Sequence, residues 1–346
     1  MGVMDPVDPQ AREAALIDAL AAVDAPERRF LRARWLTSGK PLPSAVFAAA
    51  SPDGAPLAGF ALAERRLGPL TIREVAGGYW PFRGVPLASG TSLGELPDAL
   101  ARSTDRLGRI WRLGPVVSDD PALELLRSAA ARAGWHAVER PLGQLFELDL
   151  AAQVEAGPWP STKTQRKNRW RKRRLEEDGG PIRTEFFTGA DWTAAQRDGM
   201  AAIEAASWVG KLETGGDTKF LDPEARSYWE AVSADPHIAT MICGSVMWIG
   251  EVPAAFTFGL DTGEVRYCIA NNFDERFTQF GPGRVLLYDD FARAAEMGTK
   301  RISWGVGDAG YKSEMGAEAG PRLVDLLFVR GNLLRWLLKP LWARAG

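Results

Sequence analysis

The chain is poor in the residues that build metal and redox sites. Only two cysteines, Cys243 and Cys268, and two histidines, His136 and His237, occur among its 346 residues. This excludes a disulfide-stapled fold and a cysteine-rich zinc module. No local motif around either histidine supports a histidine-based metal site or a Ser-His-Asp triad. The sequence therefore predicts no metal.

Long apolar runs and a strong net charge are also missing. No run reaches the roughly 18 apolar residues of a membrane-spanning helix. The first residues carry acids among alanines, so they lack the basic start and apolar core of a signal peptide. Forty-two basic against 44 acidic residues leave a net charge of −2, so no global field attracts nucleic acid. We expect a cytoplasmic protein, with peripheral attachment to the cytoplasmic face of the inner membrane as an alternative.

Two series of strands recur in the same order along the chain. Leu57–Leu62 resembles Pro253–Phe258, and Arg109–Gly114 resembles Arg301–Val306 at a nearly constant offset. The second series is expected to begin with a strand at His237–Met241. Matching order at constant offset indicates a duplicated module, with mixed sheets flanked by helices in each copy.

This repeat predicts an α+β fold of two tandem modules. We expect a degenerate N-terminal module over residues 1–156 and a C-terminal catalytic module over residues 181–346, ending in an amphipathic helix. A basic helix over residues 157–180 is expected to join them.

The joining segment carries a dense run of positive charge. Between Ser161 and Leu175 there are eight cations and no acid: Lys163, Arg166, Lys167, Arg169, Arg171, Lys172, Arg173 and Arg174. Eight like charges repel one another, so an anionic partner is expected. RNA phosphates, anionic lipid headgroups or the phosphates of a cofactor fit equally. The structural alternative is a solvated helix that docks on the core through Trp170 and Leu175.

A glycine pair precedes a predicted helix in the second half. After the strand Val265–Ala270, the chain reads Gly281-Pro282-Gly283-Arg284 and then turns helical. Glycines at a helix N-terminus let backbone N–H groups approach a pyrophosphate. Neither a P-loop nor a Rossmann fingerprint is present. An ordinary Pro-Gly turn is the alternative.

Together these motifs resemble the GNAT superfamily of acyl-CoA N-acyltransferases. The sequence is most similar to the CelD-like acetyltransferase branch and more distantly to the tandem Fem-type transferases. The resemblance covers about residues 160–315 and departs from the general loop at one place, where Thr278 stands for Arg or Gln. It is carried by an ordered set: the basic run Lys163–Arg174, Glu204-x-x-Ser207-Trp208, Phe273–Phe277 before Pro282-Gly283, and Gly305-x-Gly307-Asp308-x-x-Tyr311-Lys312.

The resemblance implies direct attack of an amine on the thioester of an acyl-CoA co-substrate. Glu204 is the first candidate base, because it shares a helix face with Ser207 and Trp208, and Asp308 is the second. Tyr311 is the candidate acid for the thiolate, and Lys312 a candidate anchor for a phosphate or carboxylate. The structural alternatives are a surface acid at Glu204, a turn cap at Asp308 and a core position for Trp208.

Substrate and cofactor contacts follow from the same resemblance. A backbone N–H near Asn271 is expected to polarise the thioester carbonyl. The candidate substrate-binding residues are Ser207, Trp208 and Asn271, and the candidate cofactor-binding residues are Gly281, Gly283 and Arg284.

The last segment, Asn332–Ala345, combines leucines and tryptophans with three cations and no acid. It is too short to span a bilayer, but its composition suits a helix at an anionic membrane surface, which Lys163–Arg174 is expected to share. An ordinary helix packed on the first module is the alternative.

The acceptor remains open between several amines. A long-chain sphingoid amine fits the membrane hypothesis, by analogy with bacterial ceramide synthases. An amino sugar in polysaccharide assembly is the competing acceptor. Aminoacyl-tRNA-dependent transfer of the Fem type, with the basic segment holding tRNA, is the second enzymatic hypothesis, and a non-catalytic binding module is the third.

Overall fold

The computed structural model describes residues 8–212, 217–308 and 310–344. Contacts divide the chain into two units, the first formed by Met1–Leu145 and Ala319–Gly346, the second by Phe146–Glu318. The C-terminal helix thus groups with the first unit, whereas the sequence assigned it to the second module. Ala345, the last residue of the expected helix, lies outside the described residues.

The first unit holds a mixed sheet with the strand order β1-β2-β3-β4-β11-β5. The strands β1 to β3 form antiparallel pairs, β3 and β4 run parallel, and β11 runs antiparallel to β4. The strands are β1 (Ala45–Ala50), β2 (Pro56–Leu67), β3 (Leu70–Val75), β4 (Ile110–Val117), β5 (Trp135–Asp149) and β11 (Glu318–Arg330).

Two apolar layers cover this sheet. One face carries large side chains such as Phe60, Trp111 and Phe328, packed with helices α3 and α5. On the other, Leu338 of α13 is buried with Ile110 and other strand residues. The helices are α1 (Pro9–Val23), η1 (Pro26–Arg28), α2 (Ala33–Thr37), α3 (Leu96–Arg102), α4 (Thr104–Leu107), α5 (Pro121–Arg132) and α13 (Asn332–Arg344).

The second unit repeats the strand arrangement, with the order β10-β9-β8-β7-β6. Strands β6 to β9 form antiparallel pairs, and β9 and β10 run parallel. The fold class predicted from the sequence is confirmed, since the similar segments form β2 and β8 in one case and β4 and β10 in the other. The strands are β6 (Ile182–Thr188), β7 (Ile242–Ile249), β8 (Val252–Asp261), β9 (Val265–Phe273) and β10 (Arg301–Val306).

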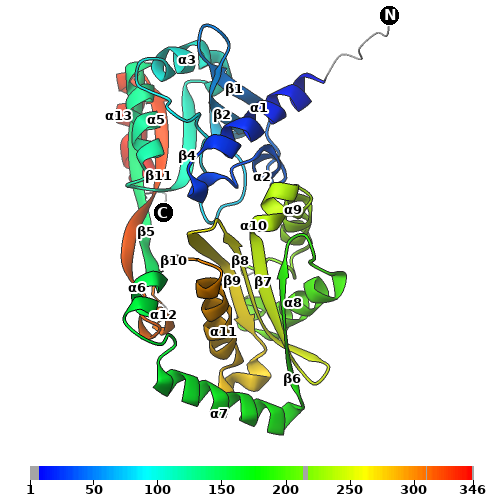
Figure 1. Ribbon diagram of the computed structural model, residues 1–346. Helices are drawn as coiled ribbons and strands as arrows, with labels where there is room; N and C mark the ends of the chain where they lie inside the picture. The colour runs from blue at the N-terminus through cyan, green and yellow to red at the C-terminus, as the bar shows by residue number, and fades with distance from the viewer. Residues whose placement is uncertain (1–7, 213–216, 309, 345–346) are drawn as a thin grey trace, which may run out of the picture. The chain divides into compact units, whose positions relative to one another are not determined.

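Helices cover both faces of this second sheet (Figure 1). Successive strand residues point to opposite faces. Met247 packs with Val285 of α11, whereas Trp248 lies against Gly199 of α8. The helices are α6 (Leu150–Glu155), α7 (Thr162–Gly179), α8 (Ala194–Ala206), η2 (Val209–Lys211), α9 (Pro223–Ser233), α10 (Pro236–Met241), η3 (Glu275–Phe280), α11 (Pro282–Glu296) and α12 (Tyr311–Glu314).

The strand expected at His237–Met241 is wrong, because these residues lie in helix α10. Pro236 occupies the first turn, and the Asp235 carboxylate accepts hydrogen bonds from the backbone N–H groups of His237 and Ile238. This local capping outweighs the apolar pattern that suggested a strand. Within the described ranges, no helix has both the length and the apolar character needed to cross a bilayer.

Candidate active site

An opening at the edge of β9 organises the site of the second unit. The parallel strands β9 and β10 pair over only three residues, Val265–Tyr267 with Arg301–Ser303. β9 then continues to Phe273. Its paired residues are buried, whereas Cys268–Phe273 are half-buried. The second part of β9 therefore presents a partly accessible edge that β10 does not cover.

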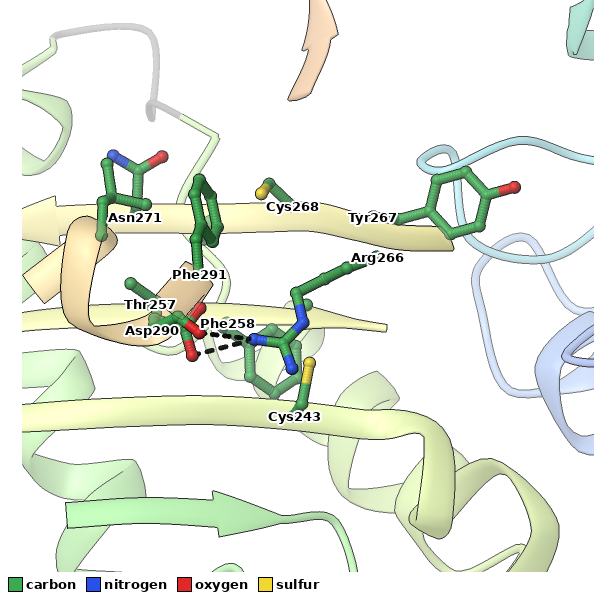
Figure 2. A pocket seen from close by; sticks show the side chains of 12 residues that line it. Cys243, Thr257, Phe258, Arg266, Tyr267, Cys268, Asn271, Asp290 and Phe291 are labelled. Carbon is green, nitrogen blue, oxygen red and sulfur yellow. Dashed lines mark hydrogen bonds and ion pairs between the residues drawn. The ribbon is translucent and has the colours of Figure 1, made fainter. Parts of the chain in front are cut away.

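In a small pocket beside this edge, the charged side chains Arg266 and Asp290 pair with each other. Figure 2 shows Arg266 reaching from β9 to Asp290 of α11, at 3.0 Å between Nη1 and Oδ1. Arg266 also binds Asp261, at 3.0 Å between Nη2 and Oδ2. Burial raises the pKa of the Cys243 thiol to about 12 and that of Cys268 well above its ordinary value. Both thiols stay neutral, so this pocket supplies no thiolate nucleophile.

The N-terminus of α11 follows the open edge and is free of side-chain caps. Gly281 occupies the N-cap with φ of 56°, a left-handed conformation that favours glycine. A Cβ on Gly283 would lie 3.0 Å from Cδ1 of Phe273, so glycine lets the helix sit directly on the end of β9. The first turn holds no acid. Such an end offers backbone N–H groups and a positive dipole to an anion.

Two of the expected site residues meet across the opening. The Tyr311 hydroxyl of α12 donates to Oδ1 of Asn271 on β9 at 3.4 Å. Burial raises the pKa of Tyr311 to about 12, so its hydroxyl stays protonated at neutral pH. Arg284 lies in the first turn of α11 and pairs at 2.6 Å with Glu314 of α12, the short helix that also carries Tyr311. Thus β9, α11 and α12 bring Asn271, Arg284 and Tyr311 to one place.

Lys312 holds the end of β10. Its ammonium donates to the carbonyl oxygens of Trp304 at 3.1 Å and Gly307 at 2.5 Å, with a longer contact to Val306 at 3.5 Å. Burial lowers the pKa of Lys312. These hydrogen bonds satisfy backbone carbonyl groups that would otherwise accept from a neighbouring strand. Lys312 therefore has a structural role at the opening.

Asp308 lies just beyond β10 and is exposed. Its carboxylate accepts hydrogen bonds from the Gly310 backbone at 2.8 Å and from the Ser313 hydroxyl at 2.5 Å. The hydrogen bond from Ser313 is the main cause that lowers its pKa. Asp308 is therefore an ionised, accessible carboxylate that also fixes the turn leading into α12.

Glu204 lies in a different environment from the one expected. It is fully buried, not a surface acid, and its two oxygens accept backbone hydrogen bonds from Lys219, Phe220 and Leu221, each at 2.8 Å. Burial raises its pKa, against the opposing effect of these three donors. Glu204 thereby ties α8 to the segment that leads into α9.

The two neighbours of Glu204 in the motif lie at the end of α8 and just beyond it. The Ser207 hydroxyl donates to the Glu204 carbonyl at 2.8 Å, which closes the end of α8. Trp208 is 58% exposed and so is not a core residue. In the described part of the chain, none of these three residues forms a hydrogen bond or ion pair with Asn271 or Tyr311.

Helix α7 contributes residues that the sequence did not single out. Leu175 is fully buried against Ile249 and Phe277, as expected, whereas Trp170, the other residue expected to dock, is 45% exposed. Nearer the start of α7, Thr164 lies beside Tyr288 of α11, and Lys172 pairs with Asp289 of the same helix at 2.6 Å. The helical spacing of Thr164, Asn168, Arg171 and Leu175 was the available signal for this inner face.

Comparison with known proteins places this site within one domain. Residues 163–313 match the acetyltransferase (GNAT) domain family, from α7 to α12. The described residues contain no group of three His, Cys, Asp or Glu side chains arranged to hold a metal. A comparison with curated proteins finds no match.

Solved structures resemble nearly the whole chain. FemX matches at 11% identity and a TM-score of 0.59, over 98% of this chain and 99% of that one. The C-terminal domain (DUF2156) of a protein from Agrobacterium fabrum, named as a lysylphosphatidylglycerol synthetase, matches at 14% identity and a TM-score of 0.52, over 95% of each chain. A conserved protein of unknown function from Bacteroides thetaiotaomicron matches at 13% and 0.50, over 93% and 96%. At these identities the similarity establishes the fold.

Proposed function

We propose that this chain, whose residues 163–313 match the acetyltransferase (GNAT) domain family, transfers an acyl group from acyl-CoA to a primary amine. The observation that carries this proposal is that, in the second unit, the open edge of β9 is followed along the chain by the uncapped N-terminus of α11. The edge suits an extended acyl-bearing arm, and the helix end suits phosphates.

The proposed reaction is a direct aminolysis. The amine nitrogen bonds to the thioester carbonyl carbon, the C–S bond breaks, and the amine loses one proton while the thiolate gains one. A backbone N–H of β9 near Asn271 stabilises the carbonyl oxygen as it becomes negative. Tyr311, protonated and beside Asn271, donates the proton to the thiolate.

Asp308 is the carboxylate that we assign as base. It is exposed and ionised, and it follows β10 directly. Glu204, with both oxygens held by backbone N–H groups, is assigned the positioning of the α8–α9 segment. Gly281, Gly283 and Arg284 are assigned to the phosphates of the donor.

Ligand-dependent stability and product formation test this proposal. A ligand at one hundred times its Kd raises the free energy of unfolding by about 2.7 kcal/mol, which shifts the thermal midpoint measurably. We expect CoA and an acyl-CoA to stabilise the protein, and an amine acceptor to cause release of free CoA thiol. If no thioester stabilises the protein or is consumed, the proposal is wrong, and binding of charged tRNA that weakens steeply with salt would favour Fem-type transfer instead.

A lipid amine is the acceptor that the first unit favours. Helix α13 buries Leu338 and packs Leu334 and Trp342 on the sheet. Its opposite side exposes apolar side chains beside the exposed cations Arg335 and Lys339, and the helix contains no acid. The exposed residues are Leu333, Trp336, Leu337 and Leu341. This pattern is typical of a helix that lies in a membrane interface, and one structural neighbour is itself named for a lipid product.

Two measurements separate the lipid acceptor from an amino sugar. The wild type is expected to sediment with vesicles that contain anionic lipid, and Trp336→Glu to remain in the supernatant with unchanged folding. Palmitoyl-CoA with a sphingoid amine is expected to react faster than acetyl-CoA with glucosamine. The opposite preference, without vesicle binding, would establish the amino sugar and refute the lipid acceptor.

A further inference from the structure

Helix α7 turns one face toward the first turns of α11 (Figure 1). Thr164, Asn168 and Arg171 follow one another at helical spacing and share this face. Thr164 lies beside Tyr288 in the second turn of α11. The Arg171 guanidinium carbon lies 4.0 Å from the position that a Cβ on Gly281 would take. The inner face of α7 therefore borders the N-terminus of α11.

Asn168 lies between these two contacts and is unusual for a buried amide. Its side chain is 6% exposed, and its Oδ1 has no hydrogen-bond partner among the described residues. Buried polar side chains nearly always have a partner. Because the amide oxygen accepts, a hydroxyl or N–H group of a ligand at the end of α11 would supply that partner.

Arg171 lies beside another cation without a carboxylate of its own. Glu314 pairs with Arg284, but within the described residues no carboxylate lies at ion-pair distance from Arg171. Burial and the charge of Arg284 both lower the pKa of Arg171. Two guanidinium groups and a helix N-terminus thus converge, with one carboxylate to balance them. This excess of positive charge suits an anion with two or more charges.

We propose that Arg171 of α7 binds a phosphate group at the nucleotide end of the donor, opposite the backbone N–H groups of α11, and that Asn168 accepts a hydrogen bond from a hydroxyl or N–H group of the donor beside that phosphate. The inference rests on the proposed use of acyl-CoA and adds a second wall to its phosphate site. The cations of α7 then differ in position: Arg171 faces the donor, whereas Arg169 is exposed and does not. Either the diphosphate or the ribose 3′-phosphate of CoA supplies the chemistry.

Calorimetric titration with CoA, dephospho-CoA and pantetheine tests the proposal. Arg171→Met removes the charge and keeps the bulk, and Arg169→Met is the matched control on the exposed face. We expect Arg171→Met to weaken CoA binding about ten- to a hundredfold, Asn168→Ala to weaken it by a smaller factor, and Arg169→Met to change it less than twofold. Pantetheine, which lacks the nucleotide and its phosphates, is expected to bind wild type and Arg171→Met equally.

The affinity of dephospho-CoA for Arg171→Met distinguishes which of the two phosphates Arg171 contacts. If Arg171 contacts the 3′-phosphate, dephospho-CoA binds the wild type and Arg171→Met with the same affinity. If it contacts the diphosphate, the loss persists with dephospho-CoA. Because Arg171 repels Arg284 in the free protein, we also expect Arg171→Met to keep or raise the unliganded thermal midpoint, which a purely structural role would lower.

The possible failures are distinguishable. If the wild type binds CoA and Arg171→Met binds it equally well, this inference is wrong while the proposed function stands. If the wild type binds no CoA, the proposed function itself fails.

Discussion

Both units contain antiparallel strands followed by a parallel strand, and they differ at the helix that precedes the parallel strand. In the first unit, α3 follows β3, and β4 runs parallel to β3; in the second, α11 follows β9, and β10 runs parallel to β9. Helix α3 spans 7 residues and carries Asp98 in its first turn after an exposed Glu95. Helix α11 spans 15 residues and has no acid there. Of these two helices, only α11 therefore has the uncapped, acid-free end that the proposed anion site needs.

The two units also differ in how fully the charged side chains near these helices are paired. In the first unit, Arg112 of β4 binds Glu74 at 3.1 Å and the fully buried Asp325 at 2.8 Å, and Arg140 binds Asp325 at 2.6 Å. Charges on this sheet are thus matched internally. In the second unit, the edge of β9 is open and Arg171 keeps an unmatched charge. Under the proposed function, local charge and glycine placement, not topology, decide which unit binds phosphate.

The largest effect is expected when α11 is given an acid in its first turn, as α3 has. Arg284→Glu places an acid in the first turn, where it opposes the phosphates and loses the pairing with Glu314. We expect CoA affinity to fall about 10²- to 10⁴-fold, since two charge-assisted contacts of about 1.5–3 kcal/mol are involved. Calorimetry measures the affinity and circular dichroism the fold. A fall below threefold would show that phosphates do not bind at this helix.

Glu204→Gln is expected to act on stability. An amide oxygen replaces a carboxylate that three backbone N–H groups share, so we expect the free energy of unfolding to fall by about 2–4 kcal/mol. Urea denaturation measures this loss, and steady-state kinetics below the unfolding transition measure the residual rate. A variant as stable as the wild type with a rate lowered a hundredfold would instead identify Glu204 as the base.

Tyr311→Phe is expected to act on the chemical step. Loss of the proton donor should lower kcat about ten- to a hundredfold, with the Kd for CoA unchanged. Because burial raises the pKa of Tyr311 to about 12, the acid form persists up to about pH 11. The wild-type rate should therefore show no alkaline loss from this group below that pH. An equal fall in kcat and CoA affinity would assign Tyr311 to binding.

The smallest effect is expected in the first unit. Asp98→Asn removes the first-turn acid of α3 and should change the stability by less than about 0.5 kcal/mol, as for most exposed positions. CoA affinity should stay the same, and CoA should still bind with a stoichiometry of one. A second equivalent of bound CoA in this variant would show that the first unit is a blocked copy of the same site.

The repeat and the loop before α11 could be predicted from the sequence because both depend on local chemistry. Strand patterns at Leu57–Leu62 and Pro253–Phe258 form equivalent strands, and Gly281 and Gly283 begin a helix as their spacing indicates. Glycines that allow a left-handed turn and a close approach keep their meaning in any context.

Tertiary partners could not be predicted in the same way. The helical face of Glu204 was visible, but the three N–H donors that occupy its carboxylate come from residues 219–221. The charge run around Arg171 was visible too, although which cation faces α11 depends on how α7 packs. The grouping of α13 with the first unit depends on β11, whose pairing with β4 joins residues about 200 positions apart.

Hydrogen–deuterium exchange with and without CoA tests whether CoA binds to the second unit alone, because it reads both units in one experiment. We predict slower exchange on CoA binding in Asn271–Val285 and in the inner face of α7, and no change in β3 or α3. Protection confined to residues 70–102, or no protection in either unit at saturating CoA, would contradict it.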